Sequence, residues 1–202
     1  MQNITSSTSF LAPPPYRQIR ARYDSETVRV YQAYRPEIAD AAVAAGRFVP
    51  PFSLDRMTWI KPSFPWMMYR CGWARKSGQE RVLSIRISRT GFEWALAHSC
   101  LSHAERPTYP SREAWQERRD SSPVRVQWDP ERDVAGNPLS WRSIQIGLGP
   151  TAVRFYVDEW ITGITDITDD VVRMRAEPDS SPMPKEKPYP LTDGLRAVIG
   201  AG

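Results

Sequence analysis

Hydrophobic and polar positions in the first third of the chain change between the spacing of strands and that of helices. Residues 28–34, VRVYQAY, are rich in β-branched and aromatic side chains and predict a strand. Residues 37–45 are strongly helix-forming, Pro36 is tolerated as a first helical residue, and Gly46 is a common helix end, so a helix is expected there. Residues 56–61 predict a second strand.

A dense block of aromatic and methionine residues follows the second strand. Pro62 ends that strand, Ser63 can cap a helix, and the apolar face of residues 64–74 predicts a helix whose Trp and Met side chains are buried. Residues 81–87 alternate apolar with polar side chains, which predicts a half-buried strand. Residues 91–101 carry packing side chains that predict a third helix.

The second half of the chain predicts a short helix about residues 114–118, strands at 124–128 and 142–148, and a helix at 151–162. The predicted order is β-α-β-α-β-α-β-β-α. This order is typical of a single α+β domain, with a mixed or antiparallel split sheet and packed helices.

Three parts are expected along the chain. Residues 1–15 end in three prolines and predict a flexible N-terminal arm. Residues 16–170 are expected to form the domain, and residues 171–202 a Pro-rich tail that docks back through its last residues. A chain of 202 residues is long enough for one domain with a core of its own.

Composition narrows the class of protein. Hydrophobic residues make up 41% and charged residues 25% of the chain, as in globular proteins. The apolar runs are too short for a membrane span and the N-terminal residues do not resemble a secretory signal, so a cytoplasmic protein is expected. The two cysteines, Cys71 and Cys100, are expected to be buried free thiols.

The charge is unevenly distributed. Residues 1–90 hold 14 Lys and Arg against 6 Asp and Glu, whereas residues 91–202 hold 13 against 17. Of the 27 basic residues 23 are arginines, whose planar guanidinium binds phosphate through two hydrogen bonds. A phosphate-bearing partner, a nucleotide or a nucleic acid, is therefore one interpretation. The other is a GC-rich coding sequence that favours arginine codons everywhere.

Metal chemistry is not expected. The histidines, His98 and His103, would diverge by about 140° around a helix, and the few possible ligands do not make a closed site. The sequence also has no GxSxG elbow, no phosphate-binding GxxxxGKS or GxxxxGKT, and no GxGxxG that opens a helix.

Two groups in the basic half are candidate binding residues. Arg20, Gln32 and Tyr34 lie among interleaved arginines and tyrosines, which can hold phosphates by charge and stack a base. Lys61 and Ser63 lie where a strand leads into a helix, a place where backbone donors collect and can meet a ligand. The alternative is a solvated sheet edge whose tyrosine rings cover apolar surface.

Asp129, Glu131 and Gln145 are the candidate catalytic residues, because they gather carboxylates and an amide at predicted strand ends. Substitution at a ribosyl carbon passes through a cation-like transition state, which a neighbouring carboxylate stabilises. We expect these residues to converge with the candidate binding residues around one pocket. The alternative is that Asp129 and Pro130 start a turn and that Glu131 and Arg132 are a surface pair.

Several segments are distinctive: YRQIRARY, VYQAYRPEIADAAVAAGRF, MTWIKPSFPWMMYRCGWA, RISRTGFEWALAHSCLS, VRVQWDPER, WRSIQIGL and PYPLTDGLRAVIGA. Through them the chain resembles, from about Tyr16 to Ala201, the family catalogued as domain of unknown function 4291. The resemblance covers nearly the full length. It implies little chemistry, since it brings no established catalytic residues with it.

A looser resemblance concerns the first strands and helix. VYQAYRPEIADAAVAAGRF, followed by the strand MTWIK and a polar residue before a helix, is similar to the opening of ADP-ribosyltransferase-like folds. The resemblance implies a split sheet, NAD as cofactor and a transferase activity. It places Gln145 at the acidic position of the late strand. It thus implies that Asp129 or Glu131 replaces the usual carboxylate, or that the chain binds without catalysis.

Three hypotheses of function follow. The first is an NAD- or nucleotide-binding protein that acts as a transferase at a ribosyl glycosidic bond. The second is a non-catalytic module that binds RNA or a nucleotide through the same arginines and tyrosines. The third is a structural protein whose Trp-rich surface meets another chain.

Overall fold

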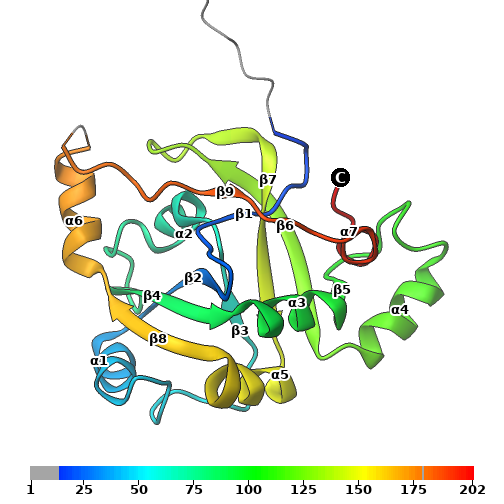
Figure 1. Ribbon diagram of the computed structural model, residues 1–202, viewed down its shortest axis with the longest axis horizontal. Coiled ribbons are helices and arrows are strands. Elements are labelled where there is room, and N and C mark those ends of the chain that lie inside the picture. The colour runs from blue at the N-terminus through cyan, green and yellow to red at the C-terminus, as the bar shows by residue number, and fades with distance from the viewer. Residues whose placement is uncertain (1–13, 179) are drawn as a thin grey trace, which may run out of the picture.

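A computed structural model describes residues 14–178 and 180–202 of the chain (Figure 1). Residues 1–13 of the predicted arm lie outside this part. In chain order the elements are β1 (Arg20–Ala21), β2 (Thr27–Tyr34), α1 (Pro36–Ala45), β3 (Thr58–Ile60), α2 (Phe64–Cys71), β4 (Arg81–Ser88), α3 (Arg89–Ala97), β5 (Ser99–Leu101), α4 (Arg112–Ser121), β6 (Val124–Arg132), β7 (Pro138–Leu148), α5 (Pro150–Phe155), the π-helical turn η1 (Tyr156–Trp160), β8 (Ile161–Asp166), α6 (Thr168–Ala176), β9 (Lys187–Pro188) and α7 (Asp193–Ile199).

The strands form a split sheet. One sheet has the order β2-β4-β8 and is antiparallel throughout. The other has the order β3-β7-β6-β5, in which β5 and β6 are parallel and the other pairs antiparallel. The short strands β1 and β9 pair separately, and in Figure 1 the C-terminal part of the chain crosses in front of β6 and β7 of the four-stranded sheet. The predicted single α+β domain with a mixed, split sheet is confirmed.

The core lies between the two sheets because each presents an apolar face to it. On β2 and β4 the inward positions alternate with polar ones, and Val28, Val30, Ile85 and Ile87 are fully buried. Helix α3 contacts strands of both sheets, and α1 covers the three-stranded sheet. The opposite face of that sheet carries Arg29, Tyr31, Ser84 and Arg86, the alternate positions of the same strands.

Helix α2 starts and stops at two local signals. The Ser63 hydroxyl accepts a hydrogen bond from the Trp66 amide at 3.2 Å, as a helix N-cap does. Gly72, with φ of 60°, ends the helix in the left-handed conformation. The prediction of a helix over residues 64–74 was therefore three residues too long. Trp66 and Met67 are buried as predicted, whereas Trp73, beyond the helix end, is half-buried.

Two predicted helices were wrong at their C-terminal ends. The segment predicted as one helix at 91–101 is helix α3 followed by β5, which pairs with β6. The helix predicted at 151–162 is α5 followed by the π-helical turn, and β8 begins at Ile161. Strand β8, with its Ile-Thr-Gly-Ile-Thr sequence, is the edge of the three-stranded sheet that the sequence pattern had assigned partly to a helix.

The C-terminal segment is tied to the domain at several points. The predicted boundary between residues 170 and 171 falls inside α6. Farther on, β9 pairs with β1, and α7 contacts α3 and β5. The Trp128 indole donates a hydrogen bond to the Ile199 carbonyl at 2.8 Å. Within the described ranges, no helix is long and apolar enough to cross a membrane.

Candidate functional site

Polar side chains from three separate segments gather where β3 leads into α2. We call Lys61, Ser63, Asp129, Glu131 and Glu186 the junction site. Lys61 and Ser63 follow β3, Asp129 and Glu131 come from β6, and Glu186 directly precedes β9. Three of these side chains are deeply buried, with exposed fractions of 6% for Lys61, 2% for Ser63 and 6% for Glu131. Charged groups are seldom buried unless they have a bonding partner or a function. The burial of this cluster therefore indicates a candidate functional site.

Strand alternation brings the carboxylates to one face of the four-stranded sheet. Along β6, Val126 and Trp128 face the core, and Gln127 and Asp129 point the other way. The register between β6 and β7 shifts between Pro130 and Arg132, and Glu131 is buried at this irregularity. A β-bulge commonly redirects one side chain in this way.

Asp129 is held by two amides. Its carboxylate oxygens accept hydrogen bonds from Gln127 Nε2 at 2.9 Å and from Gln145 Nε2 at 2.6 Å. The register explains the arrangement, since Gln127 and Gln145 are directly opposite each other on β6 and β7. Two donors of this kind fix the orientation of the carboxylate. Gln145, predicted as a catalytic residue, thus acts on Asp129 in this structure.

Lys61 is a buried cation with little direct neutralisation. Its Nζ donates to the Trp59 carbonyl at 3.2 Å and lies 5.5 Å from the centre of the Trp66 ring. The pKa of Lys61 is lowered to about 7, mainly by burial and also by the Arg70 charge, while Asp129 acts in the opposite direction. Near neutral pH the side chain can therefore either carry or accept a proton.

The two glutamates have pKa values shifted upward, mainly by burial. The pKa of Glu186 is raised to about 8, although its carboxylate accepts a hydrogen bond from the Phe64 amide at 2.6 Å. The Glu131 charge contributes to this rise in the pKa of Glu186, and the Arg20 charge opposes it. Burial also raises the pKa of Glu131 against the opposing effects of its hydrogen-bonding neighbours, among them Ser63. At neutral pH Glu186 is thus a proton donor.

Arg20 and two hydroxyl groups border the junction site. Arg20 Nη2 donates to the Glu186 carbonyl at 3.1 Å. The Tyr31 hydroxyl is buried and has no hydrogen bond to any described residue, whereas the buried Ser143 hydroxyl is a hydrogen-bonding neighbour of the Glu131 carboxylate. Ser143 lies on β7 directly opposite Asp129, and burial, with a smaller effect of the Glu186 charge, raises the pKa of Tyr31. Buried hydroxyls without a partner are uncommon and point to a ligand or water position.

Gln32 and Tyr34 belong to a second, buried network. Gln32 Nε2 donates to the Tyr34 and Thr58 hydroxyls at 2.8 Å each, and Gln32 Oε1 accepts from the Tyr156 hydroxyl at 2.7 Å. These polar groups satisfy one another, so they are not available to a ligand. The prediction that both residues would line one pocket with Lys61 and Asp129 was wrong. The two networks meet at the Trp59 carbonyl, which accepts from both Gln32 and Lys61.

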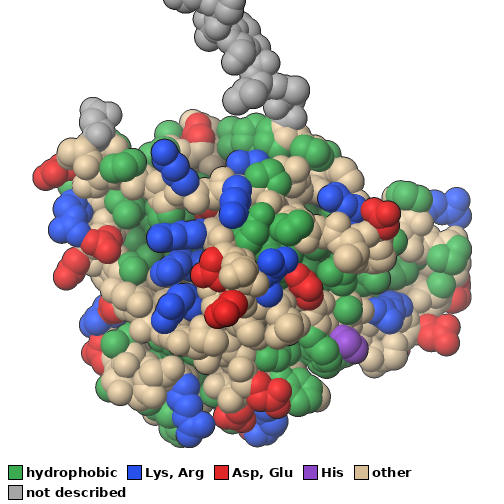
Figure 2. All heavy atoms as spheres, viewed as in Figure 1, with side chains coloured by type: hydrophobic (Ala, Val, Ile, Leu, Met, Phe, Trp, Pro, Cys, Tyr) green, Lys and Arg blue, Asp and Glu red, His purple; other side chains and the backbone are tan. Residues whose placement is uncertain are grey.

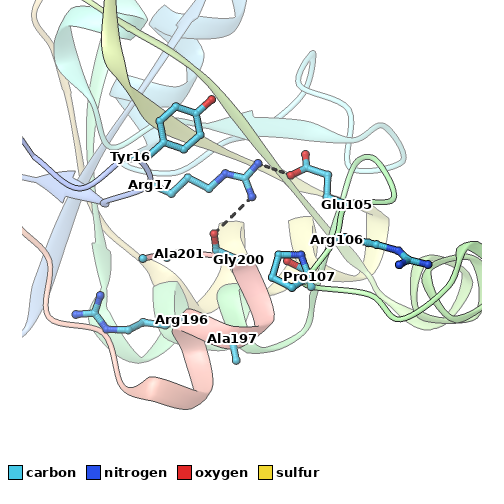
Figure 3. Close-up of a pocket in the computed structure, with 11 residues that line it drawn as sticks. Tyr16, Arg17, Glu105, Arg106, Pro107, Arg196, Ala197, Gly200 and Ala201 are labelled. Carbon is cyan, nitrogen blue, oxygen red and sulfur yellow. Dashed lines mark hydrogen bonds and ion pairs between the residues drawn. The ribbon is translucent and has the colours of Figure 1, made fainter.

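Another hollow, of about 650 Å³, lies at the C-terminal end of the chain (Figure 3). Its central cation, Arg17, is already bonded to the Glu105 carboxylate and to the Gly200 carbonyl. In Figure 3, Arg106 and Arg196 extend away from Arg17 on opposite sides. The Arg17 bonds hold the last residues of the chain against the loop that carries Glu105, which is a structural role.

Sequence reasoning missed Glu186. Glu186 lies in a Pro- and Ser-rich segment between two lysines, a pattern typical of a solvated loop. Its burial follows from the pairing of β9 with β1, which is a contact between distant parts of the sequence. For metals, the described residues contain no group of three His, Cys, Asp or Glu that could hold an ion, and Cys71 and Cys100 are buried free thiols.

The shifted pKa of Glu186 predicts a pH-dependent effect of Glu186→Gln. The pKa of the Glu186 carboxyl is about 8 in the folded protein, against an ordinary value of 4.5. Between these two pH values the folded protein keeps a proton that the unfolded chain loses, so the stability that the carboxyl contributes at low pH is lost as the pH rises through 8. The variant should match the parent at pH 4.5 and exceed it at pH 9. At pH 9 we expect the variant's free energy of unfolding to exceed the parent's by on the order of 2 kcal/mol. This is less than the full pKa shift would give, because the side chain is partly exposed.

Urea unfolding at the two pH values measures this difference. Lys61 titrates in both proteins, so comparing variant with parent isolates Glu186. The exposed Glu117→Gln is the matched control and should show no pH-dependent gain. A Glu186→Gln protein that is no more stable than the parent at pH 9 would show that the carboxyl ionises freely in the folded state.

Comparisons with known proteins agree with one part of the sequence analysis. Among curated proteins, no sequence matches this chain. One family model matches residues 18–189, well over half of the chain and including every member of the junction site. The chain therefore belongs to the family described as domain of unknown function (DUF4291).

Proposed function

We propose that this protein binds NAD or a related nucleotide at the junction site and transfers its ribosyl group by breaking the glycosidic bond. The observation that carries the proposal is the meeting of Lys61, with its lowered pKa, the protonated Glu186 and the amide-braced Asp129. Groups with opposite shifts, gathered in one place, are typical of sites that move protons.

A surface suited to a nucleotide adjoins these groups. Trp59 is half-buried and paired with Gly147 on β7, and a Cβ on that glycine would come within 2.9 Å of the Trp59 ring. The glycine thus lets the indole lie close to the strand. Strand alternation puts Lys61 and Gln145 on the same face as this indole. An aromatic ring can stack a base or the nicotinamide, and the ammonium can hold a phosphate.

The carboxylates suit the chemistry at C1′ of the ribose. The bond between C1′ and the nicotinamide nitrogen breaks, and its electron pair leaves with the nicotinamide. The Asp129 carboxylate, fixed by two amides, stabilises the positive charge that develops at C1′. An oxygen of the acceptor then bonds to C1′, and its proton passes to the Glu131 carboxylate, whose pKa is raised by burial.

Gln145 supports this division of roles. In the resemblance to ADP-ribosyltransferase-like folds it occupies the acidic position of a late strand. Here its amide donates to Asp129, two residues from Glu131 on the neighbouring strand. In the proposal the catalytic carboxylates are thus those of β6, and Gln145 orients the Asp129 carboxylate. A protein that binds the nucleotide without turnover would correspond to the non-catalytic hypothesis.

Replacing Lys61 with methionine should weaken NAD binding about tenfold or more, because it removes a charge-assisted hydrogen bond to a phosphate. The methionine keeps the apolar contacts of the side chain, so the fold should persist. Isothermal titration at pH 6 and pH 8.5 measures both effects. The parent should bind more weakly at pH 8.5, where Lys61 is neutral, and the variant should show no such change.

Lys76→Met is the matched control, because Lys76 is exposed and outside the junction site. It should bind NAD as the parent does at both pH values. If the parent shows no heat with NAD, or if Lys61→Met binds as tightly as Lys76→Met, the proposed binding site is wrong.

A further inference from the structure

Three arginines converge on the face of the three-stranded sheet that is turned away from the core. Arg22, Arg29 and Arg86 line a hollow of about 240 Å³ together with Tyr23, Asp24 and Thr27. We call these three arginines the arginine pocket. Figure 2 shows blue Lys and Arg side chains stacked in a column over the region of β2 and β4, beside a few red ones.

The strand register forces two of these cations together. Arg29 on β2 is directly opposite Arg86 on β4, and like charges in such cross-strand pairs destabilise a sheet. Burial lowers the pKa of Arg29, and the charges of Arg22 and Arg86 lower it further. The folded protein therefore bears an electrostatic cost at this position, which an anion would offset.

The three guanidinium groups form no ion pair with a described side chain, although the Asp24 charge acts on Arg29 and Arg86 from a greater distance. Among the described residues, none of the three has a carboxylate oxygen within 4.0 Å. Arg29 Nη1 donates to the Ser84 hydroxyl at 2.7 Å, which is a neutral acceptor. Asp24 accepts hydrogen bonds from the Glu26 and Thr27 amides and from the Thr27 hydroxyl, so its lone pairs are engaged within its own turn.

Two features of β8 accommodate the Arg86 side chain. Gly163 is paired with Arg86, and a Cβ at this glycine would lie 2.8 Å from Arg86 Nη2. Any other residue would displace the guanidinium. The register between β4 and β8 also shifts next to Arg86. A glycine inside a strand and a bulge both weaken a sheet, and both recur where a side chain must be directed to a function.

We propose that the arginine pocket binds the phosphoryl group of an anionic ligand, on the face of β2 and β4. Guanidinium groups bind phosphate oxygens through paired, charge-assisted hydrogen bonds, and three of them at one hollow match a doubly charged phosphoryl group. This site goes beyond the proposed nucleotide transfer, because it lies on the other sheet and contains none of the junction-site residues.

Pyrophosphate is the probe, with sodium chloride at equal ionic strength as the reference, because an exposed site would respond to salt alone. The melting temperature of the parent should rise with pyrophosphate and not with chloride. Arg86→Gln should melt higher than the parent without pyrophosphate, because it removes a like-charge pair. It should also bind pyrophosphate at least about tenfold more weakly by titration calorimetry.

Arg22→Gln tests the same loss of binding without changing a strand, in case Arg86→Gln fails to fold. The exposed Arg112→Gln on α4 is the matched control and should keep the parent's response. Asp129→Asn should keep it too, which separates this site from the junction site. The proposal is overturned if pyrophosphate acts no differently from chloride, or if the Arg86 and Arg22 variants bind it like the control.

Discussion

Replacing Trp66 with alanine should lower the free energy of unfolding by about 3–5 kcal/mol. The indole is 6% exposed and lies on α2, which packs against β2 and β6. Truncation would leave a cavity that the surrounding sheet and helix can fill only in part. It would also remove the ring face beneath the Lys61 ammonium, 5.5 Å away.

Tyr69→Ala, on the same helix, is the matched control. Tyr69 is 47% exposed and its ring contacts the Arg132 guanidinium at 3.9 Å, so its loss should cost less than about 1 kcal/mol. Guanidinium chloride unfolding of both variants gives the comparison. Equal losses for Trp66→Ala and Tyr69→Ala would mean that the buried face of α2 contributes no more than its exposed face.

Elements with local start and stop signals were predictable from the sequence. Helix α1 begins at Pro36 and ends before Gly46, whose φ of 68° requires the left-handed conformation, and both signals lie in the sequence itself. Strand β8 was missed because the π-helical turn before it continues the helical spacing of α5 up to Trp160. The change to a strand depends on pairing with β4, which no local pattern shows.

The candidate site was predictable where it follows strand ends and not where it follows distant contacts. Lys61, Ser63, Asp129 and Glu131 could be named because the sequence places each beside a predicted strand or helix end. The strand predicted at 124–128 was too short, however, since β6 continues through Asp129 and Glu131 to Arg132. Glu186 could not be named, since its burial depends on the β1–β9 pairing. Gln32 and Tyr34 look like surface residues of a polar strand.

These two residues were misassigned for a physical reason. Gln32 points to the core, where its amide bonds with Tyr34 on the same strand and with Thr58 and Tyr156 from other elements. A sequence shows that a residue is polar, but it does not show whether folding supplies its partners. The same argument applies to the arginine pocket, whose like-charge pair arises from the register of β2 with β4.

Asp129→Asn should reduce NAD cleavage by about 10²–10³-fold, because it removes the negative charge that stabilises the ribosyl cation. Its NAD affinity should stay near that of the parent, since in the proposal Asp129 acts on the transition state and Lys61 holds the phosphate. Asparagine has the same shape as aspartate and can still accept from Gln145, so the strand pairing should persist.

Release of nicotinamide from NAD, followed by chromatography, tests the central claim most directly. The parent should release nicotinamide, Asp129→Asn should lose this activity while still binding NAD, and the exposed Asp158→Asn should behave as the parent does. Release by Asp129→Asn at the parent's rate, or no release by the parent under conditions where it binds NAD, would contradict the account.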